Sequence, residues 1–500
     1  MNGTVSDAQQ AFFATIASKA TTALGQLGNV SITPIQTAGQ VFYYDYVIPN
    51  SLDFNTPTYN VLDSTVSAVS DSPPGTAVAL DLGGSFNSNY LELLNAMSWE
   101  LSAADAATVS NAAIKSSNDQ TTLVTSWEGE YGPITAAQMA AVDVATPIDY
   151  IMYQVTNIWS GTLQNKQPPL NLTAGVRNLQ ASLPYMPSSA QSLIGPLTTW
   201  INDMEAAWPI SNLQSTQMWV RNQLITNLNS PPATFQTWDP TQPNAPAMNM
   251  PAYSTNPSAP VLFTDLNATS TNTLEVDCTA SQSSSDEVNV NFDVNGGGDI
   301  PIDAFILGVS GSVKFNLFSA NGTGTSASVQ LTYPNPTLVA ILPQLWQQSA
   351  ASGWYLAGMI QQAATNPNTG TPQNPVFANT GYAFPNGAPN GFNLGVGGNF
   401  GRLAGLAVSQ MPTVVITYAT GDYSEFNESF DENTSWSLSF LGIPLGGANQ
   451  SVYQAKAHQN TVGGGFTLTF APPSQTGLAS YSLYGFIIGG YAVYPGAQDV

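Results

Sequence analysis

The first 230 residues repeat hydrophobic positions mainly at helical spacing. Phe12, Ile16 and Ala20 recur every four residues and Gly25 follows, so the pattern predicts a helix that begins near Ser6 and ends before that glycine. The same spacing predicts helices over 90–117, 134–159, 189–208 and 211–228. Two runs rich in aromatic and β-branched residues, 40–48 and 76–82, predict strands. We therefore expect a helical region that also holds a small sheet.

Residues 230–260 interrupt this pattern. They contain eight prolines and one charged residue, Asp239. Proline fixes φ and has no N–H, so neither a helix interior nor a central strand can run through the segment. Phe235, Trp238 and Tyr253 give the segment more apolar area than a flexible linker carries. We interpret it as an extended strap that lies on the protein surface between two different halves.

After the strap the hydrophobic period changes to two. Val288, Val290 and Phe292 fall on one side of a run whose other side is Asn and Asp, which is typical of a half-buried strand. Residues 312–333 predict a hairpin that pairs 313–317 with 329–333 across a Gly/Asn turn. Further strands are expected over 413–419, 435–441, 451–457 and 466–470, with a buried pair within 477–497. Residues 365–399, rich in Asn, Pro and Gly, predict a long loop region.

These patterns predict an α+β fold in two parts. The expected domains are a mainly helical one over 1–229, the strap over 230–260, and a mainly β, sandwich-like one over 261–500 with antiparallel strands. No repeat of fixed period is found, which disfavours a propeller or a solenoid.

Composition narrows the function. Only 8% of the residues are charged, against about 25% in an average domain. Eight basic and 31 acidic residues give a net charge of -23. Nucleic acid and anionic lipid both require basic patches, so neither is an expected partner. The surface must be covered largely by Asn, Gln, Ser, Thr and Gly.

The sequence lacks the residues and motifs that most catalytic mechanisms require. Cys278 is the only cysteine, so an internal disulfide and a cysteine-based zinc site are excluded. His458 is the only histidine and stands in a polar context typical of a surface position. There is no G-x-S-x-G motif and no P-loop, and the glycines over 395–401 do not match G-x-G-x-x-G. No secretory signal is recognised. The expected location is nevertheless extracellular or surface-associated, because few basic residues leave few trypsin-type cleavage sites.

The clearest local signal is an acidic cluster of five carboxylates within eleven residues. They are Asp422, Glu425, Glu428, Asp431 and Glu432. Three interpretations stay open: a solvated acidic loop, a calcium site built from carboxylate oxygens, and a pH-sensitive switch in which crowded carboxylates raise one another's pKa. Apart from that calcium ion, no cofactor is expected. A second acidic region over 286–303 resembles half of a calcium loop, but strand and turn explain it better.

One enzyme class needs only two carboxylates, the glycosidases. Glu128 with Glu130 is one candidate pair, with Trp127 and Tyr131 as sugar platforms. Asp203 with Glu205 is another. Acids on helix surfaces explain both pairs equally well, so they do not establish an enzyme.

Three functional hypotheses remain. The first is a non-catalytic, surface-acting protein that binds a cell-surface glycan or a neutral membrane, and in its most specific form a pore-forming toxin whose amphipathic strands line a barrel. The second is a self-assembling structural protein, a filament, layer or crystalline store. The third is a carbohydrate-active enzyme. We expect a homo-oligomer.

Overall fold

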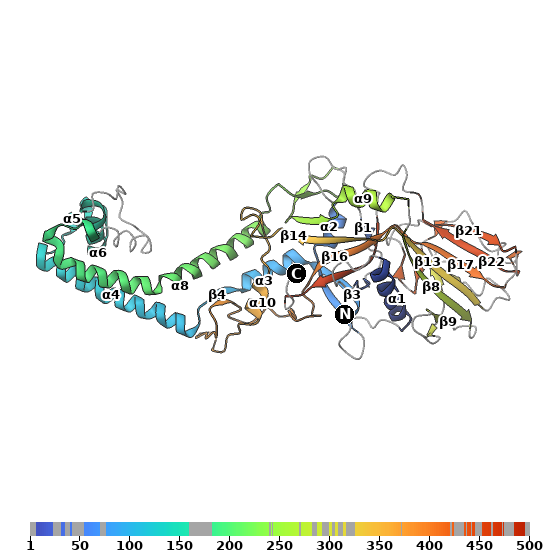
Figure 1. Ribbon diagram of the computed structural model, residues 1–500, viewed down its shortest axis with the longest axis horizontal. Helices are drawn as coiled ribbons and strands as arrows, with labels where there is room; N and C mark the ends of the chain where they lie inside the picture. Colours follow the sequence, from blue (N-terminus) through green and yellow to red (C-terminus); the bar gives the residue numbers. More distant parts are fainter. Residues whose placement is uncertain are drawn as a thin grey trace. The chain divides into compact units, whose positions relative to one another are not determined.

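Figure 1 shows the computed structural model of the protein. The residues that the structure describes are 7–23, 32–35, 41–42, 55–70, 77–159, 183–239, 242, 244–269, 272–282, 288–292, 300–302, 306–308, 314–316, 326–371, 373–420, 423–424, 435–436, 438–441, 443–445, 453–461, 464–472, 474 and 485–495.

The chain forms two compact units that interleave along the sequence. The first comprises Met1–Asn95, Gln223–Gln361 and Pro389–Val500, and the second comprises Ala96–Asn222 and Gln362–Ala388. Helices dominate the N-terminal region and antiparallel sheets the C-terminal part, which confirms the α+β prediction. The predicted domains were three consecutive ranges, 1–229, 230–260 and 261–500, whereas each of these units combines separate segments of the chain. The predicted boundaries stay a prediction.

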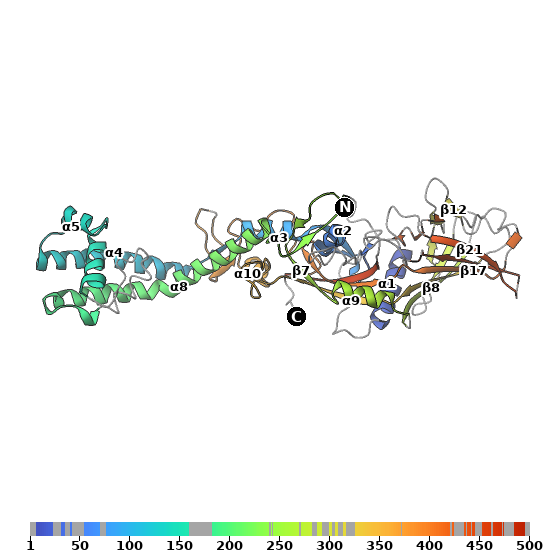
Figure 2. The same cartoon turned by 90° about the horizontal axis from the view of Figure 1, so that it is seen from above.

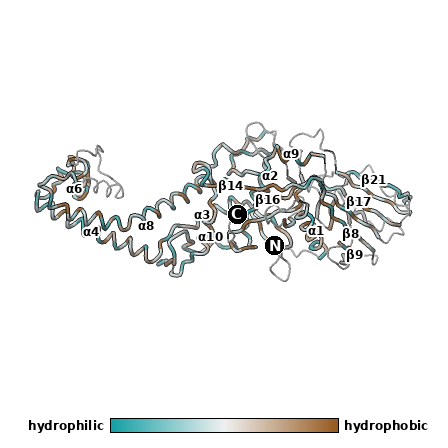
Figure 3. The backbone as a smooth tube through the Cα atoms, in the orientation of Figure 1, coloured by the Kyte–Doolittle hydropathy of each residue, from teal (hydrophilic) through white to brown (hydrophobic). Residues whose placement is uncertain are grey.

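A seven-stranded antiparallel sheet lies in the first unit, in the order β1-β23-β16-β14-β7, with β2 pairing with both β16 and β3. Its strands are β1 (Val41–Phe42), β2 (Ser64–Ser70), β3 (Ala77–Ser85), β7 (Tyr253–Asn256), β14 (Thr337–Pro343), β16 (Gly401–Ser409) and β23 (Gly485–Val493). All nine residues of β16 are buried, because both faces of this central strand are covered. Figure 3 shows hydrophobic residues along the path of β14 beside it.

An eight-stranded antiparallel sheet, also in the first unit, has the order β10-β9-β8-β13-β17-β22-β21-β18. Its strands are β8 (Thr273–Gln282), β9 (Val288–Asn291), β10 (Ile300–Ile302), β13 (Ser326–Pro334), β17 (Thr413–Tyr418), β18 (Ser435–Trp436), β21 (Tyr453–Gln459) and β22 (Phe466–Ala471). Buried and solvent-facing positions alternate along β13, β17 and β22, as the period of two predicted. One face of this sheet is therefore core and the other is polar.

The predicted hairpin over 312–333 is wrong. Strand β12 (Lys314–Asn316) pairs with β11 (Ile306–Gly308), whereas β13 pairs with β8 on one side and β17 on the other. The alternation of hydrophobic residues identified which face of β13 is buried, and Val329, Leu331 and Tyr333 are indeed in the core. It carried no information on the partner strand, because β8 and β17 present the same period.

Helix α1 (Asp7–Ala23) joins the two sheets, and its bounds lie close to those predicted. It contacts β8 and β10 of one sheet and β3 of the other. Phe12 is 1% exposed and its ring lies 5.0 Å from that of Phe440 and 6.0 Å from that of Phe292. The apolar face of this helix therefore packs on the body of the first unit.

Shorter elements complete the first unit. They are α2 (Thr56–Leu62), α3 (Phe86–Ala96), α9 (Ala259–Asn267), α10 (Met359–Ala364) and the two-stranded sheets β5 (Gln236–Thr237) with β6 (Met248–Asn249) and β19 (Ser439–Phe440) with β20 (Ile443–Pro444). Helix α3 extends by one residue and α10 by three into the second unit.

The segment predicted as a strap holds β5, β6 and β7. Strand β7 lies at the edge of its sheet, where proline is tolerated. The predicted terminal strand pair is described as one buried strand, β23, and residues 475–484 lie outside the described part.

The second unit is built on two long antiparallel helices, α4 (Ala103–Tyr131) and α8 (Gln191–Asn229), which lie side by side in Figures 1 and 2; residues 223–229 of α8 belong to the first unit. Trp200 is 1% exposed, and its Nε1 donates to Oγ of Ser116 at 2.8 Å. Nζ of Lys115 lies 3.3 Å from Oδ1 of Asp203. The other elements are α5 (Ala136–Ala141), α6 (Pro147–Tyr153), the π-helix η1 (Gln154–Trp159), the short 3₁₀ turns η2 (Leu183–Tyr185) and η3 (Ser188–Ala190), and the pair β4 (Ser98–Glu100) with β15 (Gly381–Ala383).

Three helix predictions in this unit need correction. The segment 134–159 is helical as expected but is divided into α5, α6 and η1, with residues 142–146 outside any helix. The helices expected over 189–208 and 211–228 are one helix, α8, which continues through Pro196 and Pro209. Each interior proline costs about 3 kcal/mol, and the burial of residues such as Leu193 and Leu197 outweighs that loss. The helix expected over 90–117 is interrupted by β4, where Trp99 packs edge-on against Tyr382 at 4.9 Å.

None of the helices in the described part of the chain combines the length and the apolar character needed to cross a membrane.

Candidate functional site: an aromatic pocket with one arginine

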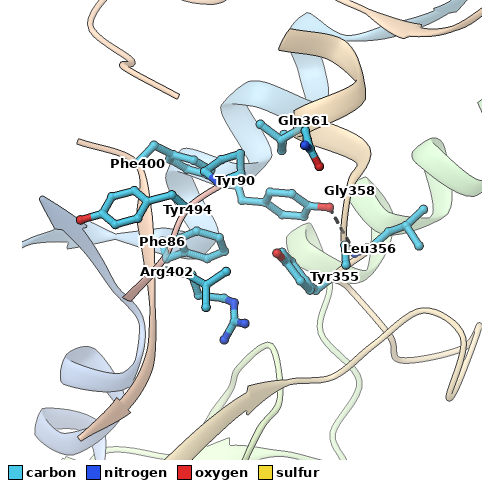
Figure 4. Close-up of a pocket in the computed structure, with 13 residues that line it drawn as sticks. Phe86, Tyr90, Tyr355, Leu356, Gly358, Gln361, Phe400, Arg402 and Tyr494 are labelled. Carbon is cyan, nitrogen blue, oxygen red and sulfur yellow. Dashed lines mark hydrogen bonds between the residues drawn. The ribbon is translucent and has the colours of Figure 1, made fainter. Parts of the chain in front are cut away.

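A pocket of about 280 Å³ lies within the first unit, and we call it the aromatic pocket (Figure 4). Five aromatic side chains line it: Phe86, Tyr90, Tyr355, Phe400 and Tyr494. Besides the tyrosine hydroxyls, Arg402 and Gln361 supply its polar side-chain groups, and they lie on opposite sides of the rings in this view. Its volume falls near the lower end of the range for small-molecule sites, about 300–1,000 Å³.

Helix α3 supplies two of the rings. Phe86 and Tyr90 are four residues apart and so lie on one face of the helix. Their rings are nearly parallel, with centroids 5.8 Å apart and an interplanar angle of 9°. Phe400, just before β16, stacks on Phe86 at 5.0 Å. These contacts make the rings a rigid wall of the pocket.

Tyr355 forms the facing wall, with its ring centroid 5.4 Å from that of Tyr90. The backbone N–H of Leu356 donates to the hydroxyl of Tyr90 at 3.3 Å, the dashed line in Figure 4. Behind it, the fully buried Trp354 donates from Nε1 to the carbonyl of Ala252 at 2.8 Å. The segment that carries Tyr355 is therefore fixed to α3 and to the core.

Arg402 brings a positive charge into these aromatic surroundings. It is 7% exposed and stands on β16, where its neighbours across the strands are Thr65 and Val493. Its Nη1 donates to the carbonyl of Ile341 at 3.2 Å, and its guanidinium carbon lies 5.4 Å from the centroid of Tyr355. Such a cation–π contact holds a guanidinium plane without neutralising its charge.

Gly401 allows the strands to close around this arginine. A Cβ atom at Gly401 would lie 2.7 Å from the carbonyl of Val66 and 2.8 Å from Cε1 of Tyr494, closer than real contacts allow. The glycine thus lets the Tyr494 ring lie on β16 at the pocket. Burial raises the pKa of the Tyr494 hydroxyl, so it stays protonated at neutral pH.

A buried polar network lies behind the pocket wall, at the start of α3. Oδ1 of Asp63 accepts from the backbone N–H of Asn87 at 3.0 Å and from the hydroxyl of Tyr253 at 2.9 Å, and Oδ2 accepts from Oγ of Ser85 at 2.5 Å. Burial raises the pKa of Asp63 to about 6, although these hydrogen bonds act in the opposite direction. The network fixes the first turn of the helix that carries Phe86 and Tyr90.

The pocket can bind but has few means of catalysis. The described residues that line it include no Asp, Glu, His, Cys, Lys or Ser, and its one formal charge is that of Arg402. A glycosidase needs two carboxyl groups, and a nucleophilic hydrolase needs a nucleophile beside a base. The lining residues offer instead apolar rings, a guanidinium, an amide and phenol hydroxyls.

The acidic cluster predicted from the sequence, Asp422, Glu425, Glu428, Asp431 and Glu432, lies outside the described residues. Its three interpretations, calcium binding included, stay predictions. The acidic residues singled out over 286–303 also lie outside the described part. Within the part that is described, no group of three or more His, Cys, Asp or Glu side chains is arranged to hold a metal ion.

The structure does not bring either glycosidase pair together in a pocket. Glu128 and Glu130 are exposed on α4, and Oε2 of Glu130 accepts from Oγ of Ser192 at 3.4 Å. Trp127 is 5% exposed and packs against Tyr131 at 4.7 Å. Asp203 faces Lys115, while Glu205 is exposed on α8. Both pairs are helix-surface acids.

The single histidine and the single cysteine are not placed for catalysis. His458 is exposed on β21, opposite Thr467. Cys278 is buried on β8, and burial raises the pKa of its thiol to about 12. A thiol with so high a pKa is a poor nucleophile at neutral pH.

Sequence reasoning missed the aromatic pocket. Its walls come from separate segments near residues 86, 355, 400 and 494, and no local motif joins them. One signal was present: Arg402 and Lys314 are the only charged residues between 304 and 421. Burying a charged side chain is costly, so a single arginine within the apolar run of β16 indicates a position with a specific role.

The comparisons with known proteins do not supply a function. No protein-family model, no curated protein and no solved structure matches this chain.

Proposed function

We propose that this is a non-catalytic carbohydrate-binding protein whose aromatic pocket receives a sugar that bears a carboxylate. The observation that carries the proposal is Arg402, held within walls of stacked aromatic rings. It makes concrete the glycan-binding form of the surface-acting function expected from the sequence.

The aromatic rings are the reason for proposing a sugar as the ligand. A pyranose presents a face of C–H groups with hydroxyls at its edge, so it can lie flat on an aromatic ring and still reach hydrogen-bonding groups. The rings of Tyr90 and Tyr355, which pack against each other and line the pocket, offer such surfaces, and Gln361 offers an amide for hydroxyl groups. Because the rings pack on one another and on Trp354, little conformational entropy is lost when a ligand binds.

Arg402 is the reason for proposing that the sugar bears a carboxylate. A guanidinium presents N–H donors in a planar fork that matches a carboxylate. Arg402 is largely buried, so its attraction for an anion is less screened by water than that of a surface arginine. Since the described residues that line the pocket include no carboxylate, an anionic ligand meets no like charge among them.

The test compares charged and neutral sugars of the same ring. Titration calorimetry with glucuronate and galacturonate is expected to show binding, and glucose and galactose are expected to bind at least about tenfold more weakly. Arg402→Lys should weaken uronate binding while keeping the buried charge. Tyr355→Ala should weaken both classes of sugar, because it removes a wall from a half-buried position.

Tyr131→Ala is the matched control, since Tyr131 is a partly exposed tyrosine of the second unit. It should leave binding unchanged. Circular dichroism of each variant establishes that it is folded. Absence of binding by every uronate, or equal binding of glucuronate by the wild type and both pocket variants, would contradict the proposal.

A further inference from the structure

A second hollow, separate from the aromatic pocket, lies on the polar face of the eight-stranded sheet. It has a volume of about 400 Å³ and is bordered by β8, β9, β13 and β17. Strands β8, β13, β17 and β22 follow one another in the sheet and can be traced in this order in Figure 1. We call this hollow the sheet groove.

One row of hydrogen-bonding side chains crosses the groove. Asn291 pairs with Thr279, Thr279 with Ser328, and Ser328 with Thr417, so the four residues form one line across four strands. All four point to the polar face, because their neighbours in sequence are core residues. Adjacent strands are about 4.8 Å apart, so a hydroxyl or amide is presented at each such step. That step is close to the length of one sugar residue in an extended chain.

A second row runs parallel to the first, two residues along each strand. It consists of Asp277, Gln330 and Val415, which are aligned by the same strand pairing. Nε2 of Gln330 donates to Oδ1 of Asp277 at 2.9 Å, which fixes the carboxylate on the exposed face. The carboxylate can accept hydrogen bonds from hydroxyl groups, and Val415 offers an apolar contact between the polar positions.

The charge of the groove selects against polyanions. Among the described residues that line it, the one formal charge is the negative one of Asp277, on a chain whose net charge is -23. An acidic polymer would be repelled, whereas a neutral one meets only hydrogen-bonding groups and one apolar side chain.

From these observations we propose that the sheet groove binds an extended neutral polysaccharide laid across the strands. Hydroxyl groups along one edge of the polymer contact the Asn291–Thr417 row, and those along the other edge contact Asp277 and Gln330. This site is independent of the aromatic pocket, which selects a single acidic sugar.

The experiment measures retention of the full chain by neutral polysaccharides. Depletion by insoluble cellulose, chitin and starch granules, and retardation in native gels containing xylan or mannan, are compared for wild type and variants. The wild type should bind at least one of these five polymers. The double variant Thr279→Val with Ser328→Ala removes two hydroxyls from exposed positions and should weaken that binding by at least about tenfold.

Thr332→Val is the matched control, because Thr332 stands on β13 and the same face but outside the groove. It should bind as the wild type does. Arg402→Lys should also leave polysaccharide binding unchanged, so failure of this proposal is distinguishable from failure of uronate binding. The proposal is overturned if none of the five polymers retains the protein or if the double variant binds equally well. Analytical ultracentrifugation tests whether this face instead binds a second copy of the chain. The proposal is also overturned if the wild type is a dimer and the double variant is a monomer.

Discussion

The hydroxyl of Tyr253 donates a hydrogen bond to the carboxylate of Asp63 at 2.9 Å, across 190 residues of sequence. Tyr253 stands on the edge strand β7, and the same carboxylate accepts the backbone N–H of Asn87 in the first turn of the helix that carries Phe86 and Tyr90 of the aromatic pocket. The same carboxylate is 5% exposed. A buried acid that fixes a helix start makes stability depend on pH.

Wild-type stability should therefore fall between about pH 4 and pH 6. Burial raises the pKa of Asp63 from 3.8 to about 6, so the folded state favours the protonated carboxyl group. That stabilisation is fully present below the ordinary pKa and is lost as the pH rises through the folded-state pKa. Asp63→Asn should remove this dependence and raise the free energy of unfolding above pH 6 by up to roughly 3 kcal/mol. Urea unfolding at a series of pH values measures it.

The exposed acid Asp265 on α9 provides the control for that series. Asp265→Asn should follow the wild-type profile throughout. A wild-type profile without a fall between pH 4 and pH 6 would contradict the role assigned to Asp63.

Ser116→Ala should destabilise the second unit. Trp200 is 1% exposed and donates from Nε1 to Oγ of Ser116, so the substitution leaves a buried N–H without its acceptor. The expected loss is about 1–3 kcal/mol in the free energy of unfolding. Ser117→Ala, at the exposed neighbouring position on α4, should change it by less than about 0.5 kcal/mol. Equal effects of the two substitutions would exclude the buried hydrogen bond as the cause.

Gly401→Ala should disturb the fold and the pocket together. The added Cβ would meet the Val66 carbonyl at 2.7 Å and the Tyr494 ring at 2.8 Å, so a strand or the ring must shift. Overpacking of this kind costs about 1–3 kcal/mol, and displacement of Tyr494 should weaken uronate binding. Gly84→Ala on β3 is the control, because nothing lies within 4 Å of its added Cβ. Thermal unfolding and calorimetry measure both effects, and an unchanged Gly401→Ala protein would show that the close contacts are easily relieved.

The pKa of Asp119 on α4 should fall when Asp203 is neutralised. Burial and then the nearby charge of Asp203 raise this pKa, while Lys115 lowers it. Asp203→Asn should shift the pKa partway toward its ordinary value, because the contribution of burial remains. Carboxyl titration by NMR measures the shift. Glu205→Gln, an exposed acid two residues away on α8, should leave the titration of Asp119 unchanged.

The sequence predicted those elements whose hydrophobic positions repeat on one face. Helix α1 and strands β13, β17 and β22 each bury one side, so their period was visible. Strand β16 was missed, because a strand covered on both faces has no alternation and five of its nine residues are Gly, Ala or Ser. The break at β4 was missed as well, since it depends on pairing with residues 381–383, far along the chain.

The candidate site was harder to predict than the fold. Arg402 was visible as an isolated charge, but its partners were not, because Tyr355 and Ile341 reach it only through tertiary structure. The acidic cluster drew attention because its five residues lie within eleven positions of the chain. The groove row from Asn291 to Thr417 was hidden for the opposite reason, as each strand contributes one ordinary polar residue.

The contact between Tyr90 and Leu356 joins residues separated by 266 positions, and Arg402 and Tyr494 complete the same pocket from later in the chain. Loop closure over such separations is slow, and contacts of this kind form late in folding. Uronate binding should consequently appear only in the last kinetic phase of refolding. The ligand would then serve as a probe that discriminates fully assembled molecules from partly folded ones in any preparation.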